Sequence, residues 1–288
     1  MSWFIFTLLS ITSLAVAELI QQKILRSKEN EIDERSSTVL TYFFPIILVL
    51  IFILFTRHRA ELFSVFDQGV FSYLLLASFT ASLGVFFYLK SFNAKNICFS
   101  LVFMSFSAVV STILGIIFLN ESFYITKFIG VGLILSSLVF LNFKSAVIEK
   151  YHWYGLVAGV FFGISYIMDK LVVIDTSPVT YLFWSFTLVT LGTFFLNPRA
   201  VIETIKVTKI AEYKPLMISG LGFMFFNLFT FTAYTYGGEV GRVDAINNTE
   251  IFLVILAEYF ILKQKKDIKI KLITALIAIV GVYLLGVF

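Results

Sequence analysis

The residues that could do chemistry in this sequence lie inside long apolar segments, and the densest group falls in residues 241–262. This segment carries Asp244, Asn247, Asn248, Glu250 and Glu258. On a helix with about 100° per residue, all of these except Glu250 fall within about 100° of one another. Such a polar stripe predicts a cavity for a solute, hydrogen bonds to a neighbouring helix, or a helix that begins late and leaves Asp244 in water. Glu250 points elsewhere and is a candidate proton carrier, because an unpaired charge inside a membrane is costly.

A second set of ionisable residues occupies matching places early in each half of the chain. Glu18 precedes a polar run. It lies either at a helix end whose long side chains extend to the aqueous phase or in a cavity as a carboxylate. Lys90 could neutralise it from a parallel helix. Asp169 and Lys170 are adjacent in sequence, so on a helix they point about 100° apart and need not pair with each other. Asn227 lies among phenylalanines, where its amide either orients a solute or bonds a neighbouring helix.

Aromatic side chains with a polar group complete the set of candidates. Tyrosine and tryptophan join a broad apolar face to a polar tip, which suits a partly hydrated pocket. The tyrosines and the tryptophan that we expect near a cavity are Tyr42, Tyr88, Tyr166, Trp184 and Tyr234. The predicted substrate-binding residues are therefore Asn227, Asp244, Asn247, Asn248, Tyr166, Trp184, Tyr88 and Lys90. The predicted coupling or gating residues are Glu18, Glu250, Glu258, Asp169 and Lys170.

The sequence offers little for enzymatic or metal chemistry. Cys98 is the single cysteine, and His58 and His152 are the only imidazoles, so neither a disulfide nor a zinc site is expected. No P-loop, no paired aspartates for a diphosphate and no H-E-x-x-H motif is present. We therefore expect no cofactor, no metal and no enzymatic activity.

The elements that position these residues follow from composition. The chain has 288 residues, of which 59% are apolar and 14% charged, whereas soluble proteins carry about 25% charged residues. A helix that crosses the hydrocarbon core needs about 20 apolar residues. The apolar segments are 2–25, 39–56, 69–91, 97–119, 124–143, 152–174, 178–196, 215–236, 241–262 and 268–287. Continuous apolar runs predict helices, and the fold class is an all-α integral membrane protein with ten transmembrane helices.

Five segments on each side of residue 144 predict two repeats, 1–143 and 144–288. At a constant shift of 143 residues, 88–141 overlays 231–284 without a gap. An odd number of spans per repeat reverses the second copy, so the repeats have inverted topology, a common plan for secondary transporters.

Two further patterns predict local structure. Gly155, Gly159 and Gly163 recur every four residues, which predicts a helix face that a neighbour approaches closely, either for packing or for sliding during a rocking motion. Residues 197–214 mix apolar and basic side chains and predict a short amphipathic helix at the membrane surface.

One motif links the chain to a known family. The run Ile117-Phe-Leu-Asn-Glu121, followed by the glycine-bearing segment 130–141, resembles the EamA repeat of the drug/metabolite transporter superfamily. In that family a helix ends in a leucine, a small residue and a glutamate. The second copy reads Ile261-Leu-Lys-Gln264, with glutamine where glutamate is usual, and the proline often found earlier is absent at Ser105 and Asn248. The resemblance implies transport of metabolites such as amino acids, nucleotide sugars, cofactors or drugs, often with proton coupling or exchange.

Two arguments about orientation disagree. Of the 22 lysines and arginines, 17 lie at connections that follow odd-numbered spans. The positive-inside rule therefore places those connections in the cytoplasm and both termini outside. Transporters of the family that the chain resembles keep both termini in the cytoplasm. We give the charge count the greater weight, and we expect the chain in the cytoplasmic (inner) membrane of a prokaryote.

These features together predict a secondary transporter that moves a small polar or amphipathic metabolite by alternating access. Mixed charges at Glu18, Lys90, Lys170 and Asp244 favour a zwitterion such as an amino acid, with protons as a candidate coupling ion. Alternatively, Lys90, Lys170 and Arg242 could hold an anionic metabolite such as a nucleotide sugar in an exchanger. The expected partners are a small-molecule substrate and the lipid bilayer, with no nucleic acid, in a monomer or homodimer. A non-transporting scaffold and an intramembrane enzyme are the other classes, and a dry, fully packed bundle would indicate the scaffold.

Overall fold

Every regular element in the described part of the chain is a helix. The computed structural model describes residues 2–26, 34–66, 69–91, 93–94, 100, 103–142, 149–196, 198–208, 210–250, 252–253 and 268–287. The α-helices are α1 (Ser2–Arg26), α2 (Glu34–Leu54), α3 (Phe71–Ser91), α5 (Ser107–Leu119), α6 (Ile125–Asn142), α7 (Lys150–Val173), α8 (Pro178–Leu196), α9 (Pro198–Val207), α10 (Ile210–Thr235), α11 (Val240–Asn247) and α13 (Ile268–Val287). Two short 3₁₀ helices, η1 (Arg57–Glu61) and η2 (Ser64–Phe66), follow α2.

Six helices in the described part of the chain are long and apolar enough to cross a membrane. These spans are Ser2–Gln21, Ser36–Leu54, Phe71–Ser91, Lys150–Val173, Pro178–Leu196 and Tyr213–Thr235. Three shorter apolar helical segments are Ser107–Leu119, Ile125–Ser137 and Leu276–Leu285. The predicted all-helical membrane class is confirmed, and the number of ten spans stays a prediction.

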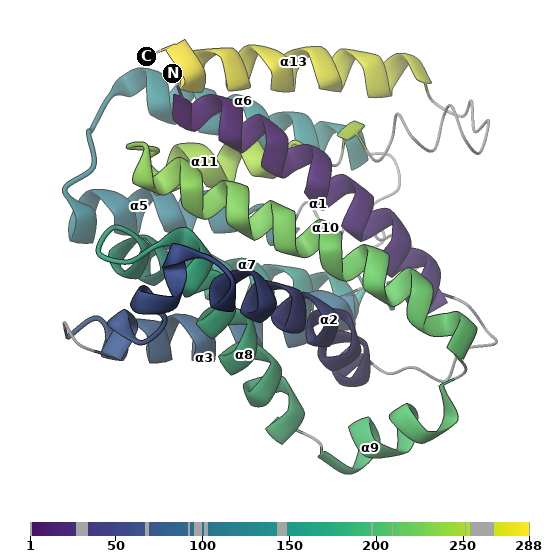
Figure 1. Cartoon of the computed structure of the whole chain (residues 1–288). Coiled ribbons are helices and arrows are strands. Elements are labelled where there is room, and N and C mark those ends of the chain that lie inside the picture. Colours follow the sequence, from purple (N-terminus) through teal and green to yellow (C-terminus); the bar gives the residue numbers. More distant parts are fainter. Residues whose placement is uncertain are drawn as a thin grey trace.

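The contacts between helices form two matching sets. Paired in chain order, α1, α2, α3, α5 and α6 correspond to α7, α8, α10, α11 and α13. With this pairing α1 packs on α10 as α7 packs on α3, and α2 packs on α10 as α8 packs on α3. Three contacts, α2 with α8, α5 with α11 and α6 with α13, join counterparts to each other. Figure 1 shows α13 lying along α6 at the top of the view and α1 crossing beside α10. The helices of the first half and their counterparts in the second half therefore pack in matching ways.

The fourth and ninth predicted spans are both interrupted, at equivalent positions. Turns fall at 105–106 and at 248–249. The shift of 143 residues that overlays the two halves places the first turn on the second. The predictions of continuous helices over 97–119 and 241–262 are therefore wrong at these points. At the second turn the backbone N–H and the side-chain Nδ2 of Asn248 both donate to the Asp244 carbonyl oxygen, at 3.0 and 2.9 Å, and the N–H of Thr249 turns to the Ile246 carbonyl three residues back, at 3.0 Å. α5 and α11, which flank the two turns, pack against each other.

The glycine face of α7 lies against the first of these turns. A Cβ atom added to Gly159 would lie 2.4 Å from the carbonyl oxygen of Met104, and one added to Gly155 would lie 2.4 Å from that of Ser100. Real Cβ atoms do not approach backbone oxygens so closely, and the backbone cannot move away as a flexible side chain can. The predicted close approach is confirmed.

A short helix occupies the predicted amphipathic region. α9 contacts α2 and α8 and lies at the bottom edge of the molecule in Figure 1. Val201 is fully buried, whereas Lys206 is exposed. The predicted amphipathic helix is confirmed, although α9 ends at Val207, before the end of the predicted region.

Candidate binding cavity and charged cluster

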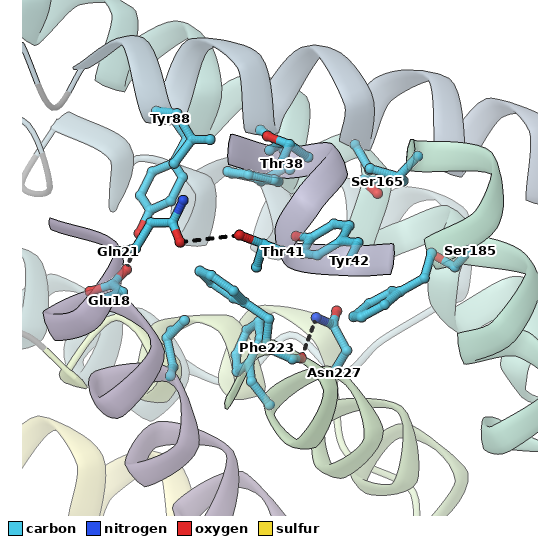
Figure 2. Close-up of a pocket in the computed structure, with 18 of the residues that line it drawn as sticks. Glu18, Gln21, Thr38, Thr41, Tyr42, Tyr88, Ser165, Ser185, Phe223 and Asn227 are labelled. Carbon is cyan, nitrogen blue, oxygen red and sulfur yellow. Dashed lines mark hydrogen bonds between the residues drawn. The ribbon is translucent and has the colours of Figure 1, made fainter. Parts of the chain in front are cut away.

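A cavity lies between helices from both halves of the chain. It is lined by side chains of α1, α2 and α3 and of their counterparts α7, α8 and α10, together with Met104. Its lining includes Gln21 and Thr38, near the end of α1 and the start of α2 (Figure 2). It also includes Asp169, near the end of α7. The predicted residues that line it are Glu18, Tyr42, Tyr88, Tyr166, Asp169 and Asn227. These six come from five helices, which periodicity alone could not bring together.

Glu18 is the most buried carboxylate of the cavity wall, with 1% of its surface exposed. Its Oε1 accepts a hydrogen bond from the hydroxyl of Tyr88 on α3. Its Oε2 has no hydrogen-bond partner in the described part of the chain. An unpaired charge in such a place is costly, so the carboxyl either holds a proton or binds a cation.

Lys90 does not neutralise Glu18, which corrects the prediction of a pair. Its Nζ lies 4.7 Å from the ring centre of Tyr154 and 5.2 Å from that of Phe86, in cation–π contacts. Lys90 follows Tyr88 by two residues on α3, so its side chain points about 200° away from the tyrosine that meets Glu18. The ammonium therefore lies outside the cavity lining.

Asp169 and Lys170 diverge as expected. The Asp169 carboxylate lines the cavity and accepts a hydrogen bond from the hydroxyl of Tyr181 on α8. The Lys170 ammonium instead lies 3.1 Å from Oε1 of Glu121, outside the lining. On this turn of α7, Asp169 therefore lines the cavity and the next residue, Lys170, forms an ion pair.

Asn227 and the aromatic residues form the opposite wall. The Asn227 Nδ2 donates to the carbonyl oxygen of Phe223 at 2.9 Å, as Figure 2 shows. Tyr42 stacks on Phe186 with ring centres 4.5 Å apart. This bond uses one of the two N–H groups of the amide, so the asparagine can still accept and donate a hydrogen bond toward the cavity.

Asp244 bonds to a neighbouring helix instead of lining this cavity. Its carboxylate accepts hydrogen bonds from Ser111 at 2.9 Å, from Ser107 at 3.1 Å and from Asn248 at 3.0 Å. Both serines belong to α5, so the carboxylate ties α11 to its counterpart. Of the three interpretations of the polar stripe, hydrogen bonding to a neighbouring helix is the one that fits Asp244 and Asn248.

The remaining residues of the ninth span are equally enclosed. The Asn247 Oδ1 accepts from Ser10 of α1 at 2.5 Å, and its Nδ2 donates to Thr230 of α10 at 3.3 Å. Glu250 is 2% exposed, its Oε2 has no hydrogen-bond partner in the described residues, and it interacts electrostatically with Glu18. Glu258 lies outside the described residues.

The two other aromatic candidates are also away from the cavity lining. The indole nitrogen of Trp184 donates to the carbonyl oxygen of Leu62 at 2.7 Å, and the indole ring packs against the ring of Phe66. It therefore anchors the segment after α2. Tyr234 is buried near the end of α10.

A cluster of five charged side chains lies beyond Asp169, and we call it the charged cluster. Its members are Glu121, Lys127, Lys170, Glu239 and Arg242. The Lys127 ammonium lies 3.1 Å from carboxylate oxygens of both glutamates, and its side chain is fully buried. Arg242 Nε lies 2.7 Å from Glu239. The cluster is on the side of the molecule where α5 leads into α6 and α10 leads into α11, which we call the cluster side.

The cluster joins the two halves. Glu121 from the first half meets Lys170 and accepts a hydrogen bond at 2.6 Å from the backbone N–H of Val240, at the start of α11. Glu239 from the second half meets Lys127 and the backbone N–H of Ser122. Burial disfavours ionisation of Glu239, but the hydrogen bonds from Ser122 and the charges of Lys127 and Arg242 hold its pKa below its ordinary value.

Glu121 was predicted only as part of a motif, and Lys127 and Glu239 were not among the predicted site residues. The signal for them was weak, because charged residues at the ends of spans are ordinary in membrane proteins. No group of three potential metal ligands occurs among the described residues.

The comparisons with known proteins agree with this architecture. The model of the EamA-like transporter family matches residues 1–143 and 150–287. No curated protein matches the sequence. Among the solved structures, 28 chains match, and one whose title reads "Crystal structure of protein" is 12% identical. That structure superimposes with a TM-score of 0.73 over 98% of this chain and 96% of its own, so the two share a fold.

Proposed function

The chain belongs to the EamA-like transporter family, and from that premise we propose that it is a secondary transporter that moves a small amphipathic metabolite through the cavity by alternating access. The observation that carries the proposal is the position of the cavity between counterpart helices of the two halves. A scaffold has no need of a cavity at this place.

We propose that residues 1–143 and 144–288 are inverted repeats and move relative to each other. The paired contacts of α1 with α10 and of α3 with α7 support this, because each joins one half to the other. A small rotation of one repeat against the other would then open one end of the cavity and close the other.

The charged cluster is the closed end in this conformation. Its ion pairs and hydrogen bonds cross from Glu121 to Lys170 and Val240, and from Glu239 to Lys127. In the alternate conformation these contacts separate, and the carboxylates and cations become hydrated.

Proton coupling rests on Glu18 and Glu250. Each has a buried carboxylate oxygen with no hydrogen-bond partner among the described residues, and the two interact electrostatically. Tyr88 of α3 also faces Glu18 and donates its hydroxyl to Oε1. Two buried carboxylates close enough to interact do not both keep a charge, so one of them carries a transferable proton.

The lining favours an amine-bearing metabolite, including an amino acid, over an anionic one. The cations on which anion exchange would depend, Lys90, Lys170 and Arg242, lie in cation–π contacts or in the charged cluster. We propose that the protein acts as a monomer or a homodimer in the cytoplasmic membrane.

Thiol labelling tests alternating access without knowledge of the substrate. Ser185 lines the cavity on α8, and a Ser185→Cys variant in a Cys98→Ser background adds one thiol there. We expect a membrane-impermeant maleimide to label it from either side of the membrane, in intact cells and in inverted vesicles. A matched Ser137→Cys variant, fully buried on α6 and outside the lining, should resist labelling from both sides. Labelling of the Ser185 position from one side only would contradict the proposed transport cycle.

A further inference from the structure

Several polar side chains of the cavity wall are engaged in hydrogen bonds within the protein, and the acceptor left without a described partner is a carboxylate oxygen. Five lining side chains that can donate already do so within the protein. Their bonds run from Gln21 to Ser37, from Thr41 to Gln21, from Tyr88 to Glu18, from Ser165 to the Ala77 carbonyl and from Asn227 to the Phe223 carbonyl. In contrast, Oε2 of Glu18 is nine-tenths buried or more and accepts from no described residue. A ligand ammonium would therefore find an acceptor at Glu18, whereas a ligand carboxylate would meet the carboxylates of Glu18 and Asp169.

The charges of the lining point the same way. Glu18 and Asp169 contribute carboxylates, and no lysine, arginine or histidine is among the described residues that line the cavity. The nearest basic side chain along α7, Lys170, is paired with Glu121 at 3.1 Å. The cavity therefore has negative potential, and its two carboxylates lie at different helices, α1 and α7.

The apolar part of the wall is largely aromatic. Tyr42 packs edge-on against Phe223 with ring centres 6.0 Å apart, and Phe162 stacks on Tyr166 at 6.0 Å. The negative face of an aromatic ring attracts a cation, and its area also buries an apolar body.

The size of the cavity limits the ligand. It offers about 100 Å³ to the centres of water-sized atoms, and one water needs about 10 to 15 Å³ on that measure, so the space suits roughly seven to ten non-hydrogen atoms. This is the size of an arylalkylamine.

We propose that the cavity selects an organic monocation, a protonated amine with a small aromatic or apolar body and no carboxylate, whose ammonium binds the free oxygen of Glu18 between Tyr88 and the aromatic wall. This inference rests on the proposed function and narrows its substrate class. The amine nitrogen donates to Glu18, and the ring packs against Tyr42, Phe186 and Phe223.

A ligand series of constant shape tests the charge preference with the unmodified protein. The probes are phenethylamine, its neutral isostere 2-phenylethanol, the anion 3-phenylpropionate and the zwitterion phenylalanine. Binding is measured by the concentration dependence of the melting temperature in detergent, because a ligand that binds only the folded form raises it. We expect phenethylamine to bind roughly 10- to 150-fold more tightly than 2-phenylethanol, which is the value of a hydrogen bond to a charged group. The anion should produce no shift.

Variants locate the ammonium. Glu18→Gln should abolish the preference for the amine over the alcohol, while Glu203→Gln, an exposed carboxylate on α9, should leave it unchanged. Should Glu18→Gln fail to fold, the ligand series with the unmodified protein still tests whether the cavity prefers the amine. Equal binding of the amine, alcohol and anion, tighter binding of phenylalanine than of phenethylamine, or no binding of the amine would overturn the inference.

The outcome is separable from the test of transport. Labelling of Ser185→Cys from both sides without preference for the amine would leave a transporter of another substrate. Preference for the amine with labelling from one side only would leave a cation-binding cavity and overturn the transport cycle.

Discussion

Neutralising Glu121 should release the closed end of the cavity. Its carboxylate lies 3.1 Å from Lys127 and 3.1 Å from Lys170 and accepts the backbone N–H of Val240 at 2.6 Å, with 3% of the side chain exposed. Glu121→Gln keeps the shape of the side chain and removes one charge. The fully buried Lys127 is then left with Glu239 as its one carboxylate among the described contacts.

The size of the effect follows from the burial of the cluster. Removing one partner of a buried ion pair costs about 3 to 5 kcal/mol, because positive charge is left uncompensated. Without the charge of Glu121, the three cations of the cluster share the single carboxylate of Glu239. In the conformation that is open on the cluster side, these groups are hydrated and lose little. The equilibrium between the two conformations should therefore shift toward that open form by a factor of roughly 150 to 5,000.

Labelling of the Ser185→Cys thiol from the cluster side measures this shift. We expect Glu121→Gln to raise that rate strongly and to lower the rate from the opposite side. The matched control is Glu61→Gln, which removes a pair with His58 whose glutamate side chain is 47% exposed. Exposed pairs contribute about 0 to 1 kcal/mol, so the control should label as the parent does. Equal rates for Glu121→Gln and the parent, with an unchanged melting temperature, would refute the role of the cluster as a closure.

Three further results are expected. Gly159→Ala should lower the free energy of unfolding by about 1 to 3 kcal/mol, and with it the melting temperature, because the added Cβ would lie 2.4 Å from the Met104 carbonyl oxygen. An unchanged melting temperature would mean that the helices can separate freely. Asp244→Leu should cost about 2 to 4 kcal/mol because it strands three donors, whereas Asn227→Leu in the cavity should reduce transport and keep the melting temperature; the reverse order would exchange their roles. Because the pKa of Glu239 is lowered, its stabilising contribution is complete above the unfolded pKa of about 4.3 and is lost as the pH falls through the folded value. Glu239→Gln should therefore weaken the acid dependence of the melting temperature, and an identical acid profile for both proteins would contradict this.

Several features could be predicted from the sequence because they depend on local patterns. Continuous apolar runs of about 20 residues predict membrane helices wherever they occur, since hydrocarbon offers no partner for backbone amides. The amphipathic segment that became α9 and the glycine face of α7 are local in the same sense. The motif that ends in Glu121 identified the family.

The candidate site was predictable only in part, because periodicity gives the face of a helix and not its neighbour. Glu18, Asp169 and Asn227 line the cavity, whereas Asp244 and Asn247, polar residues of the same kind, bond to other helices. Nothing in the sequence distinguishes these two groups.

The sequence by itself determined that the chain is a helical membrane protein built from two similar halves of apolar segments, since burial of backbone and side chains in lipid leaves few alternatives. The tertiary structure alone decided which buried polar groups meet a partner and which face the cavity. Tyr88 and Lys90 illustrate the reason: they are two residues apart on α3, yet the first faces the cavity and meets Glu18, whereas the second lies over the ring of Tyr154, and which direction faces the cavity depends on how the helices are rotated and packed together.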